Sequence, residues 1–158
     1  MCALMNFPGL WGIVTGLCLF PALWLITWLT LKGDTFVMDA KGKDGAFEPR
    51  LSNYLDIAKF VLGLASGSVV LLIGSTTFHD GGIRLPPSYA SPLFLLVASI
   101  LWGLLFMVLV TLDYEAYQHK SKLYTRGKYS RNIGLGLGFL LCFCAGYVWL
   151  IVIATARP

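Results

Sequence analysis

The chain has 158 residues, of which 57% are hydrophobic and 13% are charged, and its net charge is +4. Soluble domains usually carry about 25% charged residues, so this composition argues against a water-soluble bundle. Four stretches without Asp, Glu, Lys or Arg are each about as long as the roughly 20 residues that cross a hydrocarbon layer. We therefore predict an all-α fold, an integral membrane four-helix bundle, in a single domain over residues 1–158. The predicted spans are residues 10–31, 57–78, 92–112 and 132–154.

The first helix is predicted to begin near Pro8, because proline suits the first turn of a helix. Pro21 lies in its middle and predicts a kink there, since proline removes a backbone hydrogen bond. A secretory signal normally carries Lys or Arg before its apolar segment. No basic residue precedes Leu10, so we expect this segment to be a membrane span and not a signal peptide.

The segment after the first span, residues 32–50, is rich in glycine and in charge. Two short runs within it, Thr35–Met38 and Ala46–Phe47, are compatible with the strands of a small hairpin. The second helix is then expected to open at Pro49 or Ser52, before its membrane span begins.

The third helix is expected to begin at Pro92 and to extend past its span into the cytoplasm. Tyr114, Tyr117 and Tyr124 recur at helical spacing over this extension. Tyr124 would lie about 15 Å further along the axis than Tyr114, so it needs either the segment after the first span or another chain to pack against. Gly127 is the predicted stop of this helix, and the fourth helix is expected from about residue 131.

The basic residues predict the orientation of the bundle. Of the twelve, five lie in or beside the first predicted loop and five in or beside the third. Lys and Arg concentrate in loops that stay in the cytoplasm. We therefore expect these two loops inside and both termini outside, in a plasma membrane of the bacterial inner-membrane kind.

Glycines at four-residue spacing mark candidate helix-packing faces. Small residues let helix backbones approach one another in lipid, where apolar surface alone does not drive association. Such faces either pack within this chain or bind another copy or subunit, and the sequence leaves both open. The glycines are Gly12, Gly16, Gly63, Gly67, Gly134 and Gly138.

The sequence offers little for catalysis. Cys142 and Cys144 are two residues apart and point in different directions on a helix, and His79 and His119 are expected on opposite sides of the membrane. No phosphate-binding loop, zinc signature or nucleophile elbow is present in the sequence. We expect no enzyme activity, no catalytic residue, no metal site, no cofactor and no nucleic-acid partner.

The expected function is therefore that of a non-catalytic structural or interaction subunit of a larger membrane assembly. Its partners would be the lipid bilayer and either other copies, as a homo-oligomer, or other membrane subunits, with partner contact at Tyr114, Tyr117 and Tyr124. One alternative is an oligomeric pore or membrane-disrupting effector, lined by serines of the second helix: Ser66, Ser68 and Ser75. A small-molecule transporter is a third alternative. It is disfavoured because the ionisable residues near the spans lie at their cytoplasmic edge and not deeper in the membrane: Asp56, Lys59, Asp113 and Glu115. Asp56 and Lys59 are three residues apart on a helix, so we expect them to form a local pair.

Overall fold

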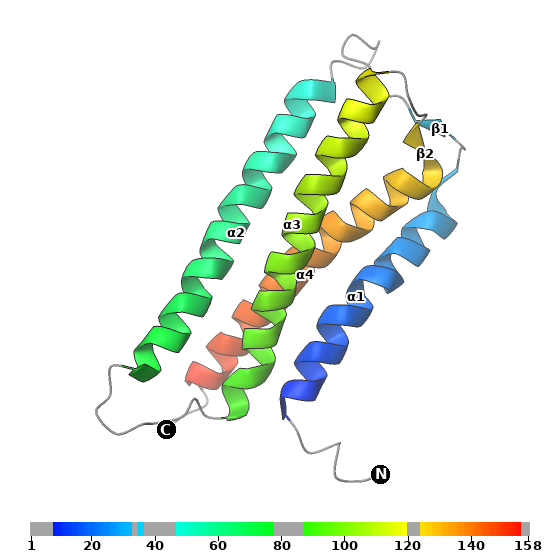
Figure 1. Cartoon of the computed structure of the whole chain (residues 1–158). Coiled ribbons are helices and arrows are strands. Elements are labelled where there is room, and N and C mark those ends of the chain that lie inside the picture. Colours follow the sequence, from blue (N-terminus) through cyan, green and yellow to red (C-terminus); the bar gives the residue numbers. More distant parts are fainter. Residues whose placement is uncertain (1–7, 33–34, 37–46, 78–86, 120–123, 156–158) are drawn as a thin grey trace.

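The computed structural model describes residues 8–32, 35–36, 47–77, 87–119 and 124–155. Within them the chain forms long helices that run up and down the molecule (Figure 1). The helices are α1 (Pro8–Thr30), α2 (Phe47–Thr77), α3 (Ala90–Gln118) and α4 (Arg126–Thr155). Each contains a segment long and apolar enough to cross a membrane. The prediction of an all-α bundle with four such helices is confirmed.

The bundle has an inner set of three helices and one outer helix. Helices α1, α3 and α4 pack closely against one another, while α2 packs mainly against α3. Helix α4 begins beside the C-terminal end of α1, crosses behind α3 and ends near the C-terminal end of α2 (Figure 1). Trp102 links α3 to α1, because its indole Nε1 donates a hydrogen bond to the carbonyl oxygen of Gly16 at 2.8 Å. Its ring also lies 5.1 Å from that of Phe20.

The end of the third helix differs from the prediction. Helix α3 stops at Gln118, with His119 as its C-cap, so the predicted continuation to Tyr124 is wrong. Tyr124 instead belongs to a short strand, β2 (Tyr124–Thr125), which pairs antiparallel with β1 (Thr35–Phe36). The chain leaves the helix because Tyr124 becomes buried, with 4% of its surface exposed, when it joins the segment after α1. Spacing along one helix carries no information about this long-range pairing.

The starts of α2 and α4 also lie earlier than predicted. Helix α4 begins at Arg126, so Gly127 lies in its first turn and does not end the helix before it. Helix α2 begins at Phe47, so this residue is not a strand, and the strand Thr35–Phe36 has β2 as its partner in place of a local hairpin. Residues 37–46 lie outside the described residues. A one-turn 3₁₀ helix, Pro87–Tyr89, leads into α3.

The two strands lie at one end of the bundle, which we call the basic end because Arg50, Arg126, Lys128 and Arg131 lie there. The start of α1 and the end of α4 lie at the opposite end (Figure 1). The two predicted basic loops therefore flank the same end of the bundle, as a consistent membrane orientation requires.

Candidate functional site

A cluster of charged and polar side chains joins α3 to α4 at the basic end. Asp113 of α3 is buried, with 8% of its surface exposed. One of its carboxylate oxygens accepts a hydrogen bond from Arg131 at 2.6 Å and another from Asn132 at 3.0 Å. The other oxygen lies 3.3 Å from Lys128 Nζ. One carboxylate thus meets two cations and an amide, so both of its oxygens are paired and the cluster keeps a net positive charge.

Asn132 links this cluster to strand β2. Its side-chain nitrogen also donates to the hydroxyl of Tyr124 at 3.1 Å, and the Tyr124 ring meets that of Tyr129 edge to face at 6.0 Å. Burial raises the pKa of Tyr124 from 10.0 to about 12, so this phenol stays neutral at physiological pH. Asp113, Asn132 and Tyr124 form one hydrogen-bonded chain between α3, α4 and β2.

A second set of contacts ties the first turns of α4 to α1. Ser130 is fully buried and its hydroxyl lies 2.6 Å from that of Thr27 and 2.8 Å from the Trp24 carbonyl oxygen. Arg126 donates to the Trp28 carbonyl and places its guanidinium over the Trp28 ring at 5.1 Å. The start of α4 is thereby held against both α1 and α3.

Beside the cluster, a groove of about 520 Å³ runs between α2 and α4, with α3 as its floor. Phe106 and Phe139 stack at 6.3 Å in its deeper part. Its basic end carries polar groups from Arg50, Tyr54 and Asn132, and its other end is apolar. The remaining lining residues are Phe47, Ile57, Val110, Tyr124, Tyr129, Ile133, Gly136, Leu137 and Leu140.

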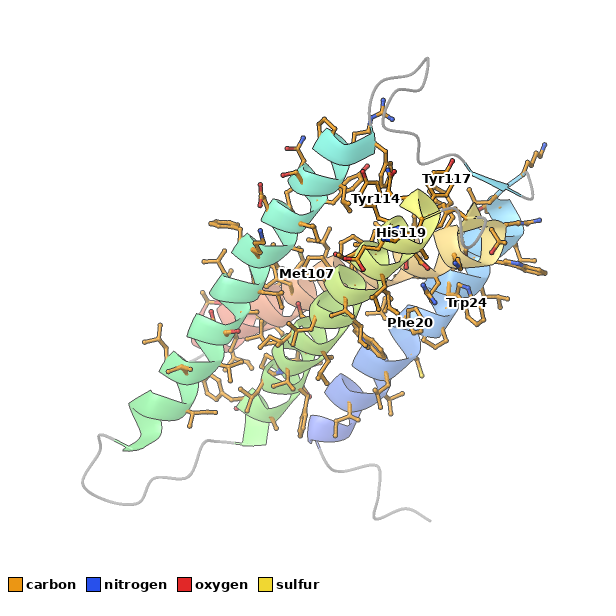
Figure 2. All side chains as sticks on the ribbon, turned by 45° about the horizontal axis from the view of Figure 1, so that its top comes forward. Phe20, Trp24, Met107, Tyr114, Tyr117 and His119 are labelled. Atoms are coloured by element: carbon orange, nitrogen blue, oxygen red, sulfur yellow. The ribbon has the colours of Figure 1, made fainter. Side chains whose placement is uncertain are left out.

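The predicted packing glycines fall into two groups. A Cβ atom added at Gly12, Gly16, Gly134 or Gly138 would meet atoms of a neighbouring helix within 4 Å. Figure 2 shows Phe20 and Trp24, which face two of these glycines, on the side of α1 that meets α3 and α4. At Gly63 and Gly67, by contrast, an added Cβ meets no described atom within 4 Å. Those two glycines do not pack within the described part of this chain.

The predicted partner-contact tyrosines lie at the basic end, where Figure 2 shows Tyr114 and Tyr117 on the last turns of α3. Tyr114 stacks on Phe47 of α2 at 5.9 Å, and both tyrosines of α3 are half-buried. Tyr124 is buried, its backbone pairs with that of Phe36 in β1, and its hydroxyl and ring meet Asn132 and Tyr129 of α4. A contact of Tyr114 and Tyr117 with a partner stays a prediction.

Neither the Asp113 cluster nor the groove was anticipated from the sequence. The signal for the cluster was an Asp directly after the third apolar stretch and a run of basic residues directly before the fourth, because a short connection makes consecutive helices antiparallel neighbours. The predicted local pair of Asp56 and Lys59 is confirmed, at 3.3 Å on the surface of α2. Among the described residues, no group of three or more His, Cys, Asp or Glu side chains is placed to hold a metal ion.

The geometry at the basic end suits binding and packing, since Asp113, Asn132 and Tyr124 are engaged with one another, whereas the buried Nε of Arg126 has no hydrogen-bond partner among the described residues. Comparison of the chain with protein-family models, with curated proteins and with solved structures finds no match.

Proposed function

We propose that this chain is a multi-pass protein of a bacterial inner membrane and serves as a non-catalytic interaction subunit that associates through the open face of α2. The observation that carries the proposal is the position of Gly63 and Gly67, which face away from the rest of the described chain. The candidate packing glycines of α1 and α4 lie against neighbouring helices of the bundle, whereas Gly63 and Gly67 of α2 do not.

The two faces of α2 explain this assignment. Ala58, Val61 and Ala65 are buried and form the side of the helix that packs against α3. Gly63 and Gly67 each follow a buried residue by two positions, which places them about 200° around the helix at 3.6 residues per turn. A glycine facing lipid brings no packing advantage, whereas a glycine facing another helix allows close backbone approach. A second copy or another membrane subunit is the occupant that such a face suits.

Replacing both Gly63 and Gly67 by Leu is expected to weaken association and to leave the fold intact. Within this chain each added side chain points into open space. At a contact with a helix of another copy or subunit it would clash, and such overpacking costs about 1–3 kcal/mol per site. Particle size and co-purification in mild detergent provide the measurement. Gly127→Leu on α4 is the matched control, because an added Cβ there also meets no described atom within 4 Å and the position lies outside the α2 face. Wild-type particle size and partner recovery for the double variant would refute this use of the α2 face.

The proposed orientation has its own test. A topology reporter fused after Thr155 is expected to be active outside the cytoplasm, and one inserted after Lys32 is expected to be active inside. The reason is that ten of the twelve basic residues lie in or beside the first and third loops, five at each, and such residues concentrate in cytoplasmic loops. Reversed activities would overturn the orientation, and activity of both reporters on one side would contradict an odd number of spans between them.

An oligomeric pore receives less support. Ser66 is exposed on α2 close to Gly63 and Gly67, but Ser68 is hydrogen-bonded to Leu64 and to Tyr147 of α4. The two serines therefore do not share one face, and the side chain of Ser75 lies outside the described residues. A conductance measurement on the purified protein in liposomes distinguishes the pore from the interaction subunit.

A further inference from the structure

We infer that the groove between α2 and α4 binds one anionic phospholipid, with its phosphate at the basic end and an acyl chain along the apolar walls. The inference rests on the proposed membrane location, but it does not depend on the association through α2. The groove lies on the side of α2 that faces α4, whereas Gly63 and Gly67 lie outside it.

The shape of the groove follows from how two helices diverge. Helices α2 and α4 meet where Ser68 is hydrogen-bonded to Tyr147. They separate toward the basic end, because α4 crosses behind α3 and lies beside α1 there (Figure 1). The resulting space of about 520 Å³ falls within the range of roughly 300–1,000 Å³ that is usual for small-molecule sites. It opens between two helices, on the flank of the bundle that lipid would surround.

The groove lies at the boundary between the basic end and the predicted membrane spans. Its α2 wall runs from Phe47 to Ile57, which is about 15 Å at 1.5 Å per residue. Its α4 side covers a similar length, from Tyr129 to Leu140. The α2 wall therefore lies before the span predicted from residue 57, at the level of the lipid headgroups. The α4 wall enters the span predicted from residue 132 by about 12 Å, from Asn132 to Leu140 at 1.5 Å per residue. A phosphate would lie at the level of Arg50, and the first part of an acyl chain would lie along the α4 wall.

The chemistry of the groove changes along this length. Arg50, Tyr54 and Asn132 line the basic end. The amide hydrogens of Asn132 are used by Asp113 and Tyr124, so a phosphate would meet the guanidinium of Arg50 and the hydroxyl of Tyr54. Directly behind Asn132, two cations face one carboxylate at Asp113, which adds positive potential. The deeper part is lined by Phe106, Phe139 and other apolar side chains. A molecule with an anionic head and a long apolar tail is complementary to both parts.

Native mass spectrometry of the detergent-purified full chain, with added phosphatidylglycerol or phosphatidylcholine, tests the proposal. The wild-type protein is expected to bind phosphatidylglycerol about tenfold more tightly, because phosphatidylcholine has the same phosphate but also a choline cation, which the positive charge of the basic end repels. Arg50→Gln should remove this preference. Lys59→Gln, at an exposed position of α2 outside the groove, should keep it.

Groove-filling variants separate the acyl-chain contact from the headgroup contact. Ile57→Trp should reduce binding of both lipids, because Ile57 lines the groove and is 52% exposed. Phe60→Trp is the matched control on α2, because Phe60 is 68% exposed and does not line the groove. Leu137→Trp repeats the test from the α4 wall. These positions are exposed enough that larger side chains leave the fold intact.

Lipid binding that is equal for wild type, Arg50→Gln and Ile57→Trp would overturn the inference and leave the groove to a helix of another protein. That result is distinguishable from failure of the proposed function, which the particle size of the Gly63 and Gly67 variant reports separately. If the protein is recovered in the membrane fraction but shows no lipid preference, lipid binding in the groove is refuted and the proposed membrane location is not.

Discussion

Replacing Asp113 by Asn is expected to lower the free energy of unfolding by about 3 kcal/mol, the lower end of the roughly 3–5 kcal/mol that breaking a buried ion pair costs. The shape of the side chain is kept, but Lys128 and Arg131 lose their shared anion. Their side chains are 24% and 31% exposed, so water compensates part of the loss. Denaturant unfolding in detergent micelles, followed by circular dichroism, gives the measurement.

The matched control for this variant is Asp56→Asn. Asp56 also pairs with a cation, Lys59, but the two side chains are 65% and 62% exposed, and a surface pair is worth about 0–1 kcal/mol. The stability change at Asp113 should therefore exceed that at Asp56 several-fold. Equal and small changes at both positions would show that the Asp113 cluster does not hold α3 and α4 together.

Replacing Gly12 by Ala is expected to destabilise the bundle by about 2–3 kcal/mol, toward the upper end of what overpacking usually costs. A Cβ at this position would lie 2.5 Å from the carbonyl oxygen of Ser91 and 2.8 Å from its Cα. Both atoms belong to the backbone of α3 and cannot rotate away, so α1 has to move. Thermal unfolding in detergent reports the loss as a lower melting temperature.

The same substitution at Gly63 should have the opposite sign. An added Cβ meets no described atom there, and Ala is favoured over Gly within a helix by up to about 1 kcal/mol. Gly63→Ala is thus an internal control in which the chemical change is identical and only the surroundings differ. A melting temperature that falls as far for Gly63→Ala as for Gly12→Ala would contradict the assignment of the two glycines to different environments.

The four helices could be predicted from composition alone, because a stretch of about 20 uncharged residues has few other uses. The ends of the helices could not. Residues 113–124 contain good helix formers, and the tyrosine spacing is helical, yet α3 stops at Gln118. The competing energy comes from Phe36, which pairs with Tyr124 from a distant part of the sequence. Local propensity is a weak prior when such tertiary pairing is available.

The candidate sites divide in the same way. The spacing of Gly63 and Gly67 resembles that of Gly134 and Gly138, and only the packing shows that the second pair faces α1 while the first pair faces outward. The groove could not be predicted, because its walls come from three helices and the sequence does not reveal the angles at which they cross. Asp113 was visible as a charge at the end of an apolar stretch, but its two cations were seen only as part of a basic loop.

The contact between Thr27 and Ser130, whose hydroxyls lie 2.6 Å apart, joins the first helix to the last. A ribosome completes Thr27 more than one hundred residues before it adds Ser130, at a rate of about 5–20 residues per second. During that interval of several seconds α1 lacks α4, one of its two main neighbours, and the surface of α1 at Phe20 and Trp24, which the glycines of α4 contact, stays open. The bundle can therefore close only near the end of synthesis, which makes α1 the segment most dependent on a chaperone or insertase that holds it until α4 arrives.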